Sequence, residues 1–135
     1  MEFLEDLVRL FAGEIDAVPV CEIPTSMAST IGAQTQFVYL SSQTVHKQRQ
    51  HHPSLSVIDY LTLPTHISNG LVLLESSKLK RLHICFERSD GDRYLATLKA
   101  TLDGRRMYVV RFHGSRPRQT KSLIGRSTIL RPHKT

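Results

Sequence analysis

The chain has 135 residues, of which 40% are hydrophobic, and a formal net charge of +6. This length suits one compact globular domain. No apolar run is long enough for a membrane span, so we expect a cytoplasmic protein with no membrane partner. The cysteines Cys21 and Cys85 lie far apart and match no zinc-finger or C-x-x-C spacing, which argues against a disulfide framework.

The charge is unevenly distributed along the sequence. Acidic residues are concentrated in the first sixteen positions. The last acidic residue of the chain is Asp103, and every charged residue after it is Lys or Arg. A purely basic segment of this kind is typical of a protein that binds a polyanion such as RNA or DNA.

The N-terminal segment predicts one helix and then little regular structure. Residues 2–12 carry apolar side chains at helical spacing and end at Gly13, which predicts a short amphipathic helix. The stretch from Ala17 to Gln36 is almost uncharged and contains two prolines, which indicates an irregular connector. We therefore divide the chain into residues 1–36, an acidic helix with its connector, and a main domain of residues 37–135.

The main domain begins with a strand and two helices. The run "QFVYL" predicts a strand, after which Ser41 or Ser42 can cap a polar helix that ends at about His52, before Pro53. A second helix is expected from Ser54, broken near Pro64 and closed by Asn69 and Gly70.

Four strand-like runs follow, "LVLLE", "RLHICFE", "YLATLKAT" and "RMYVVRFH", and they predict a meander of four antiparallel strands. The expected fold class is α+β, with the N-terminal helices packed on one face of a four-stranded antiparallel sheet.

The hairpin between the last two strands admits two registers. A two-residue turn at Asp103 and Gly104 would mix charged and aromatic side chains on each face. A three-residue loop, 102–104, pairs Leu98 with Tyr108 and gives one coherent apolar face. We therefore predict the three-residue loop, with the glycine in the left-handed conformation.

The opposite face of this predicted hairpin is polar. It carries Thr97, Lys99 and Thr101 from one strand and Met107, Val109, Arg111 and His113 from its partner, and His83 of the neighbouring strand can join them. A polar face of an antiparallel sheet often meets only water. The convergence of Lys, Arg and His beside a threonine hydroxyl nevertheless favours a functional site.

The predicted polar helix contains the run "VHKQRQHH", and zinc binding is one interpretation of it. His51 and His52 are adjacent, however, and point about 100° apart on a helix, so they do not readily share an ion. We therefore expect no metal and no other cofactor. Cys85 is interpreted as a neutral, half-buried thiol rather than a nucleophile.

The order of these motifs resembles a known group of nucleases. The run "VYLSSQTVHKQRQHHPSLSVIDYLTLP", the strands within "YLATLKATLDGRRMYVVRFHGS" and the terminal "KSLIGRSTILR" are similar to the phage-associated branch of the barnase, EndoU, colicin and RelE (BECR) ribonuclease superfamily. The similarity covers residues 37 to about 131. It implies a toxin or effector that cleaves RNA without a metal, by attack of the ribose 2′-OH, to give a 2′,3′-cyclic phosphate.

The resemblance also implies roles for particular residues. The expected catalytic residues are His46, His52, Lys99, Arg111 and His113, with the histidines as acid and base and the two cations on the phosphate. The expected substrate-binding residues are Lys47, Thr97 and Arg126. The last strand reads "VVRFH" where relatives often carry serine or threonine, so the choice of acid and base stays open.

The implied partners are RNA, for example tRNA, and an acidic immunity protein or antitoxin. Two other function classes fit the same sequence. One is a non-catalytic nucleic-acid-binding module, which predicts salt-dependent binding without turnover. The other is a structural or adaptor protein of a phage particle.

Overall fold

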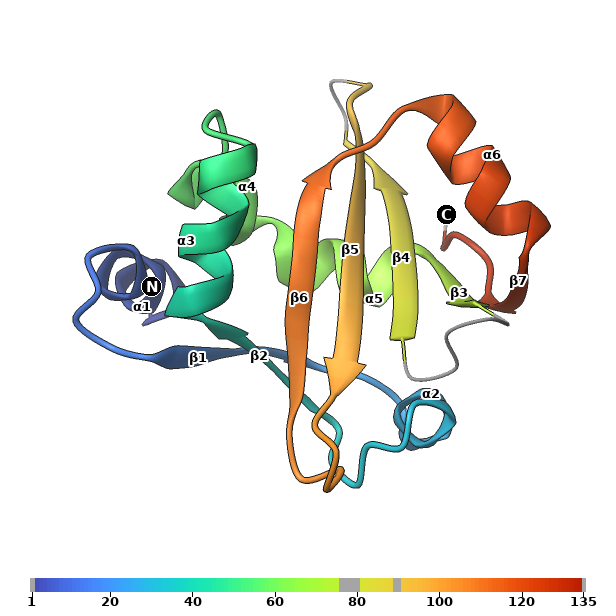
Figure 1. Ribbon diagram of the computed structural model, residues 1–135, viewed down its shortest axis with the longest axis horizontal. Coiled ribbons are helices and arrows are strands. Elements are labelled where there is room, and N and C mark those ends of the chain that lie inside the picture. The colour runs from blue at the N-terminus through green and yellow to red at the C-terminus, as the bar shows by residue number, and fades with distance from the viewer. Residues whose placement is uncertain (1, 76–80, 89–90, 135) are drawn as a thin grey trace.

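The computed structural model describes residues 2–75, 81–88 and 91–134 (Figure 1). The helices are α1 (Glu2–Phe11), α2 (Thr25–Thr30), α3 (Ser42–His51), α4 (Val57–Leu61), α5 (Leu63–Asn69) and α6 (Pro117–Gly125). The strands are β1 (Ala17–Glu22), β2 (Phe37–Ser41), β3 (Leu71–Glu75), β4 (Arg81–Glu87), β5 (Arg93–Ala100), β6 (Met107–Gly114) and β7 (Ser127–Arg131).

All seven strands form one mixed sheet in the order β1-β2-β6-β5-β4-β3-β7. The expected meander is present as β3 to β6, whose consecutive strands pair antiparallel. The predicted four-stranded antiparallel fold is wrong, because β1 and β2 extend the sheet on one side and β7 on the other. The sheet is mixed because β2 runs parallel to β6, with Tyr39 opposite Tyr108.

The segment expected to be an irregular connector is also ordered, so that prediction is wrong. It contains β1 and α2, and β1 pairs antiparallel with β2. Pro19 is tolerated because β1 is an edge strand, where one side of the backbone needs no partner. Val18 and Val20 are buried in the core, which stabilises the strand in spite of its proline. The sheet therefore crosses the domain boundary predicted at residue 36.

The helices follow their local signals closely. In α1, Leu7 and Leu10 are buried, as the amphipathic pattern predicts. In α3, the Ser41 hydroxyl accepts a hydrogen bond from Thr44 N at 3.1 Å, which confirms the predicted cap. The second predicted helix is two short helices, α4 and α5. Pro64 lies in the first turn of α5. The N–H groups of a first turn have no partner within the helix, so a proline there costs no hydrogen bond.

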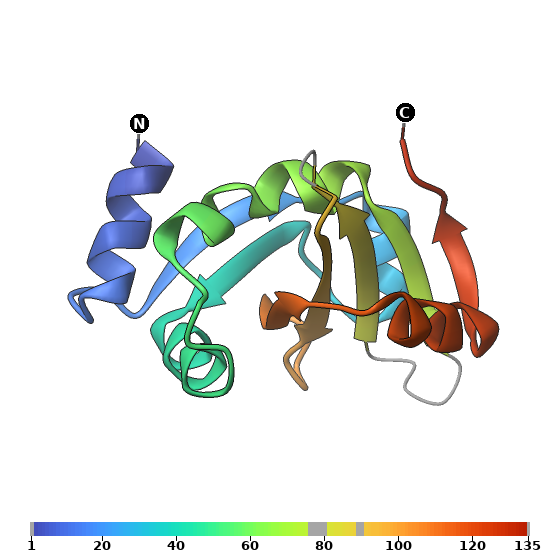
Figure 2. The ribbon, with the colours of Figure 1, turned by 90° about the horizontal axis from the view of Figure 1, so that it is seen from above.

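The helices lie on both faces of the sheet, as Figure 2 shows. On one face, α4 and α5 cover a core in which Tyr60, Leu63 and Phe112 are fully buried. On the other face, α3 and α6 project from the sheet, with the ends of β4, β5 and β6 between them. The prediction that helices cover only one face is therefore wrong, and the second face is enclosed only in part.

The β5–β6 hairpin does not have the predicted register. Near the turn, Lys99 lies opposite Tyr108 and Leu98 opposite Val109, which is the register of the rejected two-residue turn. A bulge then shifts the register, so that Thr97 lies opposite Arg111. As predicted, Gly104 adopts a left-handed conformation, with φ of 74°.

The bulge has a clear physical effect on the two faces of β6. Met107 and Val109, which were expected on the polar face, are fully buried in the core. Beyond the bulge, Phe112 points into the core, while Arg111 and His113 lie on the opposite face with Thr97. A strand with one uniform register would expose apolar residues in one of its halves, and the bulge avoids this.

Candidate nucleic-acid interface

A hollow of about 450 Å³ lies between the open sheet face and α6. Four arginines line it: Arg81, Arg111, Arg118 and Arg126. We call this hollow the arginine groove. His83, His113 and Glu75 also line it. Guanidinium groups stay charged and can bind phosphate oxygens bidentately, so this lining is chemically suited to a phosphate group.

The groove continues past His113 into a second hollow of about 830 Å³, lined by His52, Arg93 and Arg116 among others. The two hollows share His113 and Gln119. His113 therefore lies at the junction of two cation-lined spaces.

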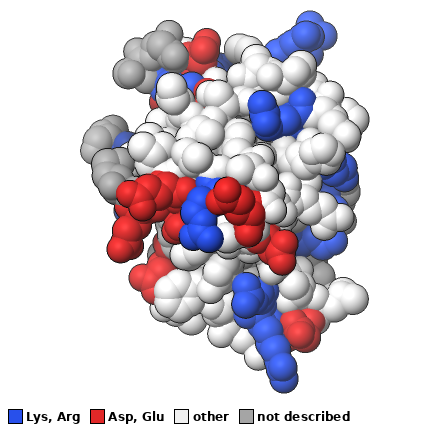
Figure 3. Space-filling model, turned by 90° about the vertical axis from the view of Figure 1, so that its left-hand side faces the viewer, with Lys and Arg blue, Asp and Glu red and all other residues white. Residues whose placement is uncertain are grey.

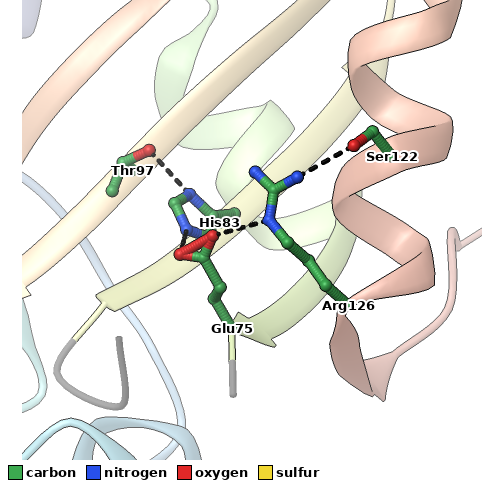
Figure 4. A network of polar contacts seen from close by, with 5 residues as sticks. All are labelled: Glu75, His83, Thr97, Ser122 and Arg126. Carbon is green, nitrogen blue, oxygen red and sulfur yellow. Dashed lines mark hydrogen bonds and ion pairs between the residues drawn. The ribbon is translucent and has the colours of Figure 1, made fainter. Parts of the chain in front are cut away.

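Below the arginine groove, five side chains form the network of polar contacts in Figure 4. Thr97 is fully buried and its hydroxyl lies 2.9 Å from His83 Nδ1. His83 Nε2 lies 3.6 Å from Glu75 Oε2. We assign the Thr97 hydroxyl as donor to Nδ1, because the imidazole proton is then on Nε2, facing the carboxylate. Because it is buried, Thr97 holds His83 and does not face a ligand.

The same network holds an arginine at the edge of the groove. Arg126 Nε donates to Glu75 Oε1 at 2.9 Å, and its Nη1 donates to Ser122 Oγ at 2.9 Å. The hydrogen bond from Arg126 lowers the pKa of Glu75, and burial lowers the pKa of His83. Glu75 is therefore charged and His83 neutral at pH 7, and the carboxylate fixes the position of a guanidinium that is half exposed.

His113 is paired with a second histidine from a distant part of the chain. Its ring stacks on that of His52 at the end of α3, with ring centroids 4.8 Å apart. His113 Nδ1 lies 2.7 Å from the Gly114 carbonyl oxygen, so Nδ1 carries the proton and Nε2 is left as a base. Burial lowers the pKa of His113. The imidazole is therefore neutral near pH 7 and able to accept a proton.

The position of α3 explains how His52 reaches this place. Gln48 of α3 is buried and its Oε1 accepts a hydrogen bond from Phe112 N of β6. The helix thus replaces β2 as the partner of β6 beyond Tyr108. The stack of His52 on His113 follows at the end of α3.

The other two candidates on α3 lie elsewhere. His46 lines a separate hollow with Leu10 and Phe11 of α1, and its Nε2 lies 3.3 Å from Gln50 Nε2. Lys47 is exposed, and it points about 100° away from Gln48, the residue that contacts β6. The structure does not bring His46 and Lys47 to the groove.

Lys99 shares the open sheet face but lies further along it. It is four residues from Leu95, which is the cross-strand partner of His113. Four strand residues span about 13 Å. This separation favours contact of Lys99 and His113 with different phosphates of a bound chain. Lys99 lies opposite Arg81 on β4, so the cationic surface is continuous between them.

Several residues of the groove were not singled out from the sequence. They are Glu75, Arg81, Arg118, Gln119 and Ser122. A signal existed for α6, because Pro117 begins a run in which Arg118, Ser122 and Arg126 recur at a spacing of four, the period of one helix face. Glu75 gave no comparable signal, since an acidic residue that ends a strand is common at a surface.

Metal binding and thiol chemistry are two alternatives for this face. Among the residues that the structure describes, no three His, Cys, Asp or Glu side chains are grouped so that they could hold a metal ion. Burial raises the pKa of the Cys85 thiol to about 11, so this cysteine is not a thiolate at pH 7.

The molecule is electrically asymmetric. Figure 3 views the end that carries α1, where acidic side chains gather. Glu2 and Glu5 lie in the first turn of α1, and Arg9 Nε lies 3.6 Å from Glu14 Oε2. The arginine groove lies away from this end, beside α6. A polyanion is therefore attracted to the groove and repelled from the α1 end.

Comparison of the chain with protein-family models, with curated proteins and with solved structures finds no match. The resemblance to the BECR ribonucleases therefore stays a prediction. Within the described ranges, no helix combines the length and the apolar character needed to cross a bilayer.

Proposed function

We propose that the protein is a metal-independent endoribonuclease that binds the RNA backbone in the arginine groove. The observation that supports this most directly is the position of His113, a neutral imidazole at the junction of two cation-lined hollows. The arginines supply the charge for a phosphodiester, and His113 supplies a base that works near pH 7.

In the proposed reaction, His113 Nε2 takes the proton of a ribose 2′-OH. The 2′ oxygen bonds to the adjacent phosphorus, the bond from phosphorus to the 5′ oxygen breaks, and the leaving oxygen takes a proton from water. Arg111 and Arg118 stabilise the charge that develops on the phosphoryl oxygens. The products are a 2′,3′-cyclic phosphate and a 5′-OH.

We assign His52 to positioning rather than to proton transfer. Its ring stacks on that of His113 at 4.8 Å, which leaves no room for a phosphate between the two rings. His52 and His113 therefore cannot act as acid and base from opposite sides of the phosphorus. His52 instead restricts rotation of the His113 ring.

A second candidate function is RNA binding without cleavage. The cationic surface favours it, because it continues about 13 Å along β5 to Lys99, further than one phosphodiester requires. Both functions predict salt-dependent binding, and they differ only in turnover.

The proposal carries further expectations about partners. The RNA, of which tRNA is one example, would be met in the cytoplasm. An acidic immunity protein or antitoxin would inhibit the enzyme by covering the arginine groove, because its carboxylates would replace the phosphates there.

The decisive experiment uses a 20-nucleotide RNA, labelled at its 5′ end, incubated with the protein in EDTA. Cleavage products that end in 2′,3′-cyclic phosphate support the nuclease, and an all-deoxy oligonucleotide of the same sequence should stay intact. RNA that binds but stays intact at stoichiometric protein contradicts the nuclease and supports the binding module.

Two variants separate catalysis from binding. His113→Asn should lower the cleavage rate at least ~100-fold and leave the Kd for RNA almost unchanged, because it removes a base but no charge. The matched control is His51→Asn, the same change at an exposed position of α3 outside the two hollows. Equal rates for the two variants would remove His113 from the mechanism.

A further inference from the structure

A third hollow, of about 700 Å³, lies on β5, β6 and the hairpin that joins them. Its walls are mainly apolar and include the Tyr108 ring, Ala100, Leu102 and Val110. Among the described residues, none that lines the arginine groove also lines this space. The two hollows are linked through Lys99, which lines the third hollow and lies opposite Arg81 of the groove.

The aromatic wall of this hollow is held in place by the neighbouring strand β2. Tyr108 lies opposite Tyr39 on β2, and the two rings are 6.2 Å apart between centroids. The guanidinium of Arg106 lies over the Tyr39 ring at 4.7 Å. Cation–π and ring contacts of this kind restrict ring motion, so Tyr108 offers a preformed stacking surface.

The rim of the hollow is cationic. Lys99 and Arg105 line it, and both side chains are exposed. Asp103 is the acidic side chain among the described residues that line the hollow, and it is engaged in the hairpin, accepting from Thr101 Oγ1 at 2.7 Å and from Arg105 N at 3.0 Å. An apolar, aromatic interior with a cationic rim matches a nucleotide, whose base is flat and apolar on its faces and whose phosphates are anionic.

We propose that this hollow binds an unpaired nucleobase of the RNA, stacked on Tyr108, while Lys99 and Arg105 contact the adjoining phosphates. The proposal rests on the proposed function, because it assumes that RNA occupies the arginine groove. It extends that function by naming the substrate class, a single-stranded segment long enough to fill both hollows.

The spacing along β6 sets the length of that segment. Tyr108 and His113 lie opposite Lys99 and Leu95 of β5, which are four residues apart, so about 13 Å of strand separates them; the fifth residue of β6 is taken up by the bulge. A stacked strand rises about 3.4 Å per nucleotide, so about four stacked nucleotides, or fewer extended ones, span the distance. A dinucleotide therefore reaches one hollow only.

The test measures equilibrium binding of a fluorescent single-stranded RNA dodecamer to Tyr108→Ala and Tyr108→Phe, each in the His113→Asn background so that cleavage does not interfere. Tyr108→Ala should raise the Kd about 5- to 100-fold, because stacking of one base is lost. Tyr108→Phe keeps the ring and should stay within about twofold. Equal Kd values for Tyr108→Ala, Tyr108→Phe and the His113→Asn parent that keeps Tyr108 would overturn the proposal.

A second measurement does not depend on how well Tyr108→Ala folds. A dodecamer with the same backbone but abasic sugars keeps the phosphates and lacks the stacking partner. The His113→Asn parent, which keeps Tyr108, should bind this abasic dodecamer more weakly than the normal dodecamer. Equal affinity for the two oligonucleotides would also overturn the proposal.

The outcomes separate this proposal from the nuclease. If RNA binding depends on Tyr108 but no RNA is cleaved, the base site stands and the nuclease fails. If RNA is cleaved and binding is indifferent to Tyr108, the nuclease stands and the base site fails. If the dodecamer does not bind at all, both fail.

Discussion

Gly104, in the β5–β6 hairpin, offers a sharp test of the fold. Its φ of 74° is left-handed, and a Cβ there would collide with the carbonyl oxygen of Gly32. Gln34 N also donates to the Gly104 carbonyl oxygen at 2.7 Å. The hairpin is therefore packed against the segment that follows α2, in the part of the chain that the sequence indicated to be an irregular connector.

We predict that Gly104→Ala lowers the free energy of unfolding by about 2–5 kcal/mol. The left-handed conformation costs an alanine about 1–2 kcal/mol. The collision with Gly32 is with backbone, which moves only if the hairpin or its neighbour shifts, and such overpacking costs about 1–3 kcal/mol more.

The matched control is Gly13→Ala. Gly13 has nearly the same φ, 75°, but an added Cβ there meets none of the described atoms within 4 Å. Only the conformational cost of about 1–2 kcal/mol should remain. Urea unfolding followed by circular dichroism measures both variants. Equal losses would show that Gly104 is not packed against Gly32, and would refute the arrangement of this end of the sheet.

Three further predictions concern stability. Tyr60→Phe should stabilise the protein by about 1 kcal/mol in urea unfolding, because the hydroxyl of this fully buried residue has no hydrogen-bond partner among the described residues; a loss of stability would point to a partner. Asp59→Asn should cost about 1–3 kcal/mol by thermal unfolding, because Asp59 Oδ1 accepts a 2.7 Å hydrogen bond from Arg88 and both side chains are mostly buried; Arg88→Gln is the reciprocal check. Burial lowers the pKa of His83 and His113, so the unfolded chain binds more protons than the folded one below about pH 6.5. The free energy of unfolding should therefore fall from pH 7.5 to pH 5.5. Equal free energies of unfolding at the two pH values would contradict this.

The sequence by itself determined the elements whose signals are local. Ser41 and Pro53 mark the ends of α3, because a cap and a proline act on the adjacent turn alone. Apolar runs separated by short polar breaks identified β3 to β6, and β4 to β6 alternate between apolar and polar residues because one face of each lies in the core. The same alternation placed Arg111 and His113 on one face with Thr97, although the register assumed for the hairpin was wrong.

Tertiary structure decided the rest, because it depends on contacts between distant parts of the chain. The bulge in β6 forms because apolar residues on both sides of it must reach one core, and no local signal marks it. Glu75 and Arg126 are 51 positions apart and meet because β7, which begins directly after Arg126, pairs with β3 and places Ser127 opposite Glu75. Likewise, the edge strand β1 is stable only against β2, since an isolated strand cannot satisfy its backbone or bury its valines.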